Sequence, residues 1–164
     1  MHKKKLIGDI DELKKEMQAT EPTNRYKYEF WVFEYLKLLK SEGKIIDFRM
    51  EQTVDLQRYE CGTIDVDYCL WYYEGITAQN KKLATMGFIK FCEDKDQNGI
   101  PDDPKIAKEK DSCERYGVPV LFMPVKDVST SNILHTYFSE DEKELIDDLV
   151  LRMRRSSIQF QIPD

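Results

Sequence analysis

The chain of 164 residues lacks long apolar segments and closely spaced cysteines, and it has only two histidines. No stretch approaches the roughly 20 apolar residues that a membrane-spanning helix needs, so we expect no membrane anchor. The basic residues 1–5 are followed by no apolar region, which predicts a chain without a signal peptide and a cytoplasmic location. The four cysteines (Cys61, Cys69, Cys92 and Cys113) form no Cys-x-x-Cys pair. This spacing argues against a zinc site and favours free thiols.

Positive charge is also in short supply. The chain has 25 lysine and arginine residues against 31 acidic residues, which gives a net charge of −6. This balance argues against binding polyanions by bulk electrostatics, although bound metal ions or a local basic patch would still allow a nucleic-acid enzyme. A hydrophobic content of 41% is typical of a globular protein, and the length predicts one domain over residues 1–164.

Hydrophobic periodicity predicts the order of helices and strands. Helices are expected over residues 25–41, about 104–116 and 139–155, with a further amphipathic helix over about 9–18. Strands are expected over 45–50 and 53–59 (or one long bent strand across both), 63–73, 86–93 and 118–125. A meander followed by a helical crossover to another strand predicts an α/β fold with a mixed central sheet flanked by helices, its core at about 25–125.

Two of the helices carry local boundary signals. Asp102 or Asp103 can cap the helix that starts at Pro104, and Gly117 can end it. The last helix opens with Ser139 and then an acid three residues on, which is a capping box. The segment 118–125 between them is almost continuously apolar, which predicts an interior strand.

Acidic residues stand at the end or in the middle of two expected strands. The strand over 86–93 ends in Glu93, and Lys95 follows two residues later. Residues two apart in a strand share a face, with Cα atoms roughly 6–7 Å apart. The strand over 63–73 opens with Gly62-Thr-Ile-Asp65-Val-Asp67. Each pattern taken alone also suits a solvated surface.

Together these segments resemble the PD-(D/E)xK nuclease superfamily, especially its RecB-like branch. The stretch from Gly62 to Asp65 is similar to the Gly-x-x-Asp segment, and Glu93 to Lys95 is similar to the (D/E)-x-K motif. The resemblance implies a restriction-endonuclease-like αβββαβ core with extra N- and C-terminal helices. It also implies a metal-dependent nuclease that hydrolyses phosphodiester bonds in DNA or RNA. No proline precedes Asp65, and the Gln-x-x-x-Tyr element of that branch is absent.

The resemblance also implies roles for single residues. Asp65 and Glu93 would be the metal-binding carboxylates, and Lys95 would position or activate the attacking water. The cofactor would be Mg²⁺ or Mn²⁺, which prefer oxygen ligands and polarise a phosphoryl oxygen.

A helical acid would complete the metal shell in the same resemblance. Glu29 is favoured for this role because it lies beside an apolar stripe, with Glu34 and Asp67 as alternates. Lys108 or Lys110 would correspond to the auxiliary basic residue that contacts the substrate.

The loop over 94–103 carries a competing pattern. Acids or amides at positions one, three and five followed by Gly99 match the first half of a calcium loop, so Ca²⁺ is the alternative cofactor. The twelfth position is Lys105, where an EF-hand needs a bidentate glutamate. A polar turn with side-chain caps explains the same residues without a metal.

A third alternative is a catalytically inactive module on the same fold that binds nucleic acid or protein. Trp71, Tyr72 and Tyr73 are expected at the surface, where they would leave room for a homodimer or a larger complex. Core packing would explain the same aromatic residues. Asp65 separates the hypotheses, because the nuclease needs it and the calcium loop does not.

Overall fold

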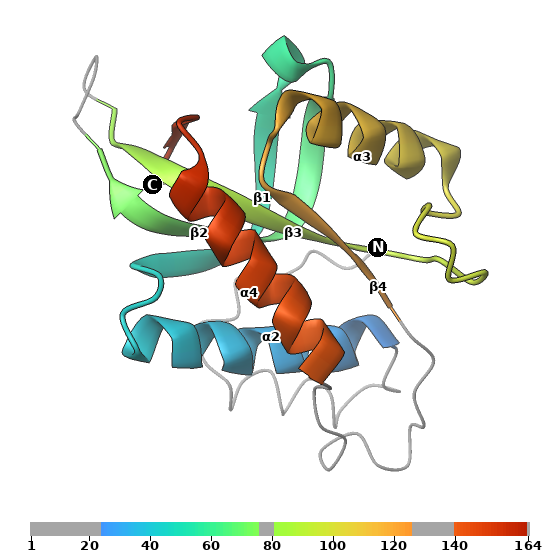
Figure 1. Cartoon of the computed structure of the whole chain (residues 1–164), viewed down its shortest axis with the longest axis horizontal. Coiled ribbons are helices and arrows are strands. Elements are labelled where there is room, and N and C mark those ends of the chain that lie inside the picture. The colour runs from blue at the N-terminus through green and yellow to red at the C-terminus, as the bar shows by residue number, and fades with distance from the viewer. Residues whose placement is uncertain (1–23, 76–80, 126–139, 164) are drawn as a thin grey trace.

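A computed structural model describes residues 24–75, 81–125 and 140–163, with side chains from Glu29 onward. The elements follow in the order α2 (Asn24–Ser41), β1 (Asp47–Leu56), η1 (Gln57–Tyr59), β2 (Gly62–Glu74), β3 (Leu83–Cys92), α3 (Pro104–Tyr116), β4 (Val120–Pro124), α4 (Glu140–Arg155) and β5 (Phe160–Gln161) (Figure 1). The helix expected over 9–18 lies outside the described residues, as does Ser139 of the expected capping box. None of the described helices is long and apolar enough to cross a bilayer.

The strands form one mixed sheet in the order β1-β2-β3-β4. β1, β2 and β3 are an antiparallel meander, and β4 returns parallel to β3 after α3. The short β5 pairs with the first residues of β3. The predicted mixed sheet with flanking helices is therefore confirmed.

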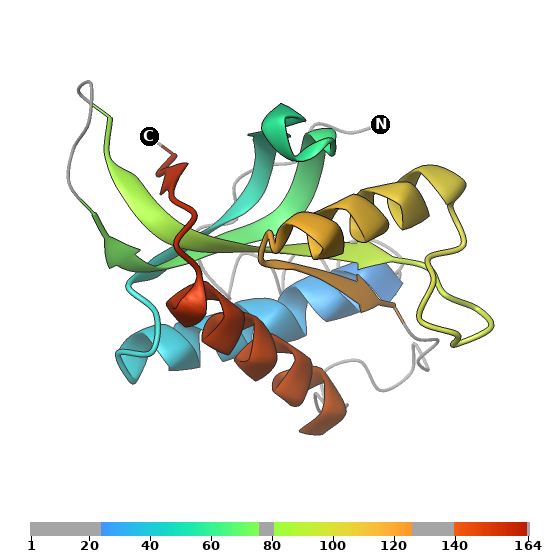
Figure 2. The same cartoon turned by 45° about the horizontal axis from the view of Figure 1, so that its top comes forward.

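Helices cover both faces of this sheet. α2 and α4 lie on one face and α3 on the other (Figure 2). The first hydrophobic core lies between the sheet and the α2–α4 pair, and the second lies under α3 and the C-terminal segment. Four consecutive residues of α2, from Phe30 to Phe33, are buried, in keeping with its broad apolar surface.

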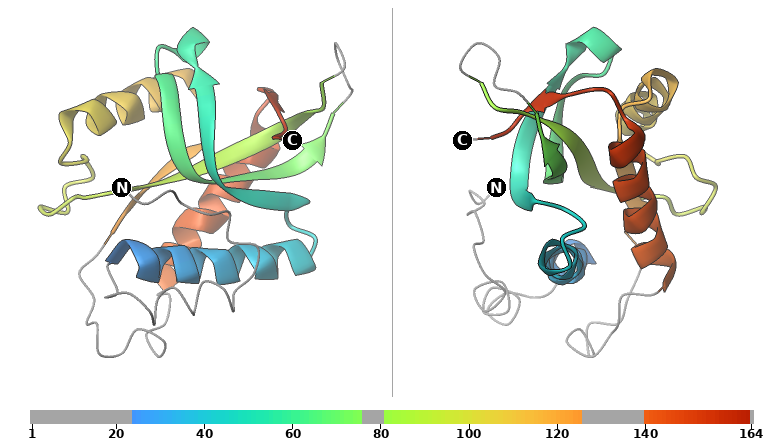
Figure 3. Two further views of the ribbon diagram at one scale, coloured as in Figure 1. Left: turned by 180° about the vertical axis from the view of Figure 1, so that it is seen from behind. Right: turned by 60° about the vertical axis from the view of Figure 1, so that its left-hand side comes forward.

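β1 and β2 bend sharply. On the two sides of the bend, residues of the same parity pack in different hydrophobic cores. Residues two apart in a strand normally share a face. Met50 and Tyr68 pack in the first core, whereas Val54 and Val66 pack in or against the second, although all four positions are even-numbered. The change falls at Glu51, whose φ of +54° is uncommon for a residue with a side chain. Figure 3 shows β1 and β2 curling away from the rest of the sheet.

The helix boundaries follow the local signals. Asp103 caps α3 by accepting a hydrogen bond from the Lys105 backbone N–H at 2.9 Å, and Pro104 occupies the first turn. Gly117 ends the helix with a φ of +69°, a backbone conformation that glycine adopts without steric cost.

Three strand predictions need correction. Residues 45–59 hold one bent strand that ends at Leu56, and the expected strand residues 57–59 form a 3-10 turn. β3 begins earlier than expected and ends at Cys92, which leaves Glu93 beyond it. Within the described residues β4 is an edge strand and not an interior one. It is buried because α3 and α4 cover its two faces.

The aromatic residues near the end of β2 divide between core and surface. Trp71 is 3% exposed and belongs to the second core, so core packing is the explanation that holds for this residue. Tyr72 is half-buried, and its hydroxyl accepts a hydrogen bond from Arg154 at 3.0 Å. Tyr73 is 57% exposed.

Candidate functional site

Two acids lie opposite one another at the bend. The residues flanking Glu51 in β1 pair with the residues flanking Asp67 in β2, so the register places the two acids side by side. Glu51 is half-buried, and Asp67 is only 5% exposed. An ionised carboxylate in such a position is costly unless other groups compensate its charge, so the location is unusual for an aspartate.

The Asp67 carboxylate joins β2 to β3. The backbone ladder between these strands ends at Tyr68 and Ile89. Directly beyond it, Asp67 Oδ2 accepts a hydrogen bond from the Phe91 backbone N–H at 2.7 Å. The side chain thus replaces a backbone carbonyl and is held in a fixed position between the two strands.

α2 brings a third acid to the same corner. Glu29 is 2% exposed, and its backbone carbonyl accepts a hydrogen bond of 2.7 Å from the buried Tyr68 hydroxyl. Burial raises the pKa of Tyr68 well above its usual value, and the charges of Glu29, Asp67 and Glu51 raise it further. Carboxylates from α2, β1 and β2 therefore lie within electrostatic reach of one hydroxyl group.

Asp65, the expected metal ligand, lies toward α3. Its side chain is exposed and accepts a hydrogen bond of 2.8 Å from the Thr53 hydroxyl. Its backbone carbonyl accepts a hydrogen bond of 2.7 Å from Lys90 Nζ. Its charge also contributes to raising the pKa of Glu109 on α3, although burial is the main cause of that shift.

Glu93 and Lys95 lie in the loop after β3, and both are exposed. Asp102 closes this loop: its backbone N–H donates to the Glu93 carbonyl at 2.8 Å, and its carboxylate accepts from the Lys95 N–H at 3.1 Å. Phe91, two residues before Glu93, packs against the Tyr68 ring at a centroid distance of 6.4 Å. The (D/E)-x-K segment therefore starts only two residues after Phe91, which contacts the corner that holds Asp67.

The remaining predicted residues divide between surface and helix. Glu34 is exposed, in contrast to the buried Glu29. Lys108 is exposed on α3. Lys110 is partly buried, and its Nζ donates to the Gly99 carbonyl at 2.5 Å and lies 3.6 Å from a Glu114 carboxylate oxygen. Lys110 thus ties α3 to the preceding loop, whereas Lys108 faces solvent.

Two acids of the 94–103 loop, Asp94 and Asp102, bind the loop's own backbone. Asp94 accepts hydrogen bonds from the N–H groups of Asn98 at 3.2 Å and Gly99 at 2.9 Å. Such side-chain caps are the expected behaviour of a polar turn. In the described parts of the chain, no three Asp, Glu, His or Cys side chains form a group that could hold a metal ion.

A magnesium site needs fewer protein ligands than three, because Mg²⁺ usually keeps several waters and uses only one or two protein carboxylates. Glu29 and Asp67 are the two buried acids of this corner. Asp67 had a local signal in the sequence, since it stands within the otherwise apolar and aromatic stretch 66–71. Glu51 was not anticipated, because its place beside Asp67 depends on the strand register.

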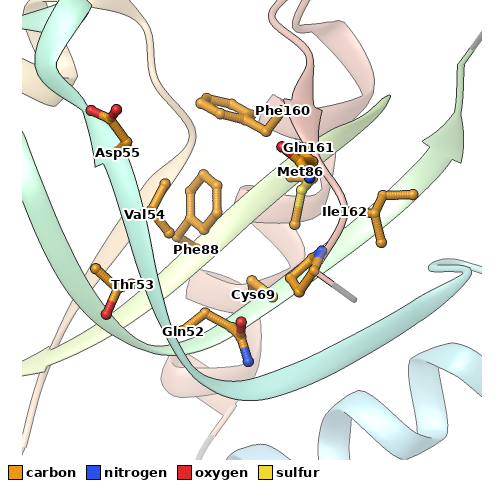
Figure 4. Close-up of a pocket in the computed structure, with 11 residues that line it drawn as sticks. Gln52, Thr53, Val54, Asp55, Cys69, Met86, Phe88, Phe160, Gln161 and Ile162 are labelled. Carbon is orange, nitrogen blue, oxygen red and sulfur yellow. The ribbon is translucent and has the colours of Figure 1, made fainter. Parts of the chain in front are cut away.

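A separate cavity of about 420 Å³ opens on the other side of the bend. It is lined by β1 residues 52–55, by β2 and β3 side chains, and by C-terminal residues 160–163. Figure 4 shows Phe88 and Phe160 at this cavity, with Asp55 at its rim. Its lining includes none of the three acids of the corner.

Comparison with known proteins identifies no relative: no family model, curated protein or solved structure matches the chain. Its function is therefore inferred from the residues themselves.

Proposed function

We propose that the chain is a metal-dependent nuclease of the PD-(D/E)xK type that hydrolyses phosphodiester bonds in DNA or RNA. The observation that carries the proposal is that two buried acids, Glu29 of α2 and Asp67 of β2, both act electrostatically on the Tyr68 hydroxyl. The chain order supports it as well. An opening helix, a three-strand meander, a helix and a fourth strand parallel to the third follow the αβββαβ order that the resemblance implies.

Each group would have a distinct role. Glu29 and Asp67 would hold Mg²⁺ or Mn²⁺, whereas Glu93 is exposed in the loop just beyond β3 and would not be a third ligand. The bound metal would polarise a phosphoryl oxygen and lower the pKa of a water molecule. The backbone N–H of Phe91 fixes the Asp67 carboxylate, so its position does not depend on the substrate. The Lys95 ammonium would orient the water and stabilise negative charge on the phosphate as it develops.

The location of the site differs from the simplest interpretation of the motif. Asp67, and not Asp65, would be the ligand from β2, because Asp65 is exposed on the side of α3. Glu29, and not Glu34, would be the ligand from α2, because Glu34 is exposed. Two matched pairs of neighbouring acids therefore test the proposal within the same two elements.

The experiment measures cleavage of plasmid DNA, single-stranded DNA and structured RNA with Mg²⁺ or Mn²⁺. We expect Asp67→Asn and Glu29→Gln each to lower the rate at least about a hundredfold, since a metal ligand stabilises the transition state by several kcal/mol. Asp65→Asn and Glu34→Gln are the controls and should keep activity. Loss of activity in Asp65→Asn but not in Asp67→Asn would contradict the proposal and show that the metal site lies on the α3 side of the sheet.

Metal binding gives a readout that does not need a substrate. Mn²⁺ should raise the melting temperature of the wild-type chain and leave that of Asp67→Asn unchanged, because a ligand that binds only the folded state stabilises it. Circular dichroism of each variant shows whether it has folded. No cleavage of any substrate, together with no Mn²⁺ binding by calorimetry, would rule out the catalytic proposal.

The cavity favours a second candidate function, an inactive module that binds a partner on the same fold. Its lining combines apolar side chains with polar ones such as Gln52 and Asp55, a combination typical of binding sites. Val54→Trp would fill the cavity, and Leu38→Trp on the exposed surface of α2 is the matched control. This function would be favoured if the chain binds an oligonucleotide or peptide without cleaving it, and if Val54→Trp abolishes this binding while Leu38→Trp does not.

A further inference from the structure

Two of the buried thiols are in direct contact. The Cys61 and Cys113 Sγ atoms lie 3.2 Å apart, although 52 positions separate the residues in sequence. Cys61 is 8% exposed and Cys113 is 1% exposed. Because a disulfide bond is about 2.05 Å long, an approach of roughly 1 Å would join the two sulfur atoms.

The backbone on both sides holds the sulfur atoms in place. Cys61 lies between Glu60 and Gly62, whose φ angles are +61° and +67°. This tight turn at the start of β2 directs Cys61 under α3. Cys113 lies in the last turn of α3, where its carbonyl accepts a hydrogen bond from the Val118 N–H at 2.9 Å. The contact therefore joins two capped and well-fixed segments.

The two thiols are not equivalent. Cys61 Sγ lies 3.3 Å from the Tyr59 carbonyl, to which it can donate, so Cys113 can donate its S–H to Cys61. Burial raises the pKa of both thiols, and this hydrogen bond lowers the pKa of Cys61 while raising that of Cys113. Cys61 is also the more exposed of the two thiols. The hydrogen bond favours ionisation of Cys61 over that of Cys113. Thiolates are the attacking species in disulfide exchange.

We propose that Cys61 and Cys113 are a modification site. The two cysteines form an intramolecular disulfide by thiol–disulfide exchange with a low-molecular-weight disulfide such as oxidised glutathione. The Cys61 thiolate attacks one glutathione sulfur, forms a mixed disulfide and releases one glutathione thiolate. The Cys113 thiolate then attacks Cys61 Sγ and displaces the second glutathione. The protons of the two protein thiols end on two molecules of reduced glutathione, so the protein loses two hydrogen atoms.

The bond would tie α3 to the turn between η1 and β2. Neither thiol belongs to the acidic corner of Glu29 and Asp67, so the inference does not depend on the proposed nuclease. A disulfide mainly restricts the unfolded chain, and the effect grows with the length of the closed loop. For the loop between Cys61 and Cys113 we expect a rise in melting temperature of about 5–10 °C.

The test treats the folded full-length chain with excess oxidised glutathione at mildly alkaline pH, removes the glutathione, and then unfolds the chain in denaturant with N-ethylmaleimide, which blocks every free thiol. Intact mass and peptide mapping should show two alkylated cysteines, Cys69 and Cys92, and one linked peptide pair. The melting temperature should rise, and dithiothreitol should reverse the rise. The double variant Cys69→Ala/Cys92→Ala keeps the contact and should behave in the same way. Cys113→Ala should gain no intramolecular bond.

Several results would overturn the proposal. One is the recovery of all four alkylated thiols from the oxidised, folded protein. Another is a glutathione adduct that persists on Cys61, because the second step would then have failed. A disulfide that includes Cys69 or Cys92 would show that local unfolding, and not the observed contact, decides the pairing. If Cys113→Ala fails to fold, the double variant still carries the test.

Discussion

Gly87 sits where β3 crosses α4, and replacing it with alanine gives a sharp test of this packing. A Cβ added there would lie 2.5 Å from Met153 Sδ, 2.7 Å from Met153 Cγ and 3.2 Å from Leu149 Cδ1. Met153 and Leu149 are fully buried, so neither side chain has open space to move into. Overpacking of this kind typically costs about 1–3 kcal/mol.

An opposing effect has to be weighed. Alanine restricts the unfolded chain more than glycine does, which stabilises a strand by about 0.5–1 kcal/mol. The clash is the larger effect, so we expect Gly87→Ala to lower the free energy of unfolding by about 1–2 kcal/mol in urea titrations. Gly75→Ala is the matched control, since its new Cβ would meet only the end of the exposed Gln159 side chain, at 2.8 Å. We expect that variant to change stability by less than about 0.5 kcal/mol.

A double-mutant cycle separates the clash from other effects. Met153→Ala alone should cost about 2–5 kcal/mol because it leaves a cavity. In the combined variant the methyl group added at position 87 would partly occupy that space. The loss should therefore be at least about 1 kcal/mol smaller than the sum of the single losses. Additive losses, or a Gly87→Ala chain more stable than wild type, would refute the close approach of β3 and α4.

Three further predictions concern single side chains. Tyr68→Phe removes the buried hydroxyl that binds the Glu29 carbonyl and should cost about 1–3 kcal/mol in urea unfolding; no loss would mean that this hydrogen bond contributes nothing. Asp103→Ala removes the cap on the Lys105 N–H and should cost about 0.5–2 kcal/mol, whereas Asp103→Asn should cost much less. Burial raises the pKa of Glu109, so its ionisation opposes folding as pH rises above about 4. Glu109→Gln should therefore melt higher than wild type at neutral pH and the same at about pH 3, and a lower melting temperature at neutral pH would contradict the shift.

The sequence predicts best the elements whose boundaries are local. α3 has its expected limits because Asp103, Pro104 and Gly117 act on their own backbone. β4 was expected in the sheet interior, because an almost continuous apolar run indicates burial of both faces. Two covering helices produce the same pattern at an edge, so the run predicts burial and does not predict strand order.

The position of the acids was harder to predict because alternation breaks at the bend. Assigning faces from Glu93 and Asp65 by strand alternation assumes that every second residue of a strand packs against the same core. At Glu51 the backbone takes a positive φ, and residues of the same parity then reach the opposite core. Only the register shows that Glu51 and Asp67 share this corner, and only the tertiary fold brings Glu29 to it.

The acidic corner poses a last question, which is why position 67 holds a carboxylate. One structural role of the side chain is to accept the Phe91 N–H, and an asparagine side-chain oxygen could do the same at lower cost of burial. The charges of Glu29, Glu51 and Asp67 all act on the Tyr68 hydroxyl, so three acids lie within electrostatic reach of one group. Asp67→Asn keeps an acceptor for the Phe91 N–H and removes the charge that would bind a metal. We therefore expect this variant to stay folded without metal and to lose all stabilisation by Mn²⁺, measured as the shift in melting temperature. If Asp67→Asn keeps the Mn²⁺ stabilisation of the wild type, the reason for placing a metal at this corner disappears.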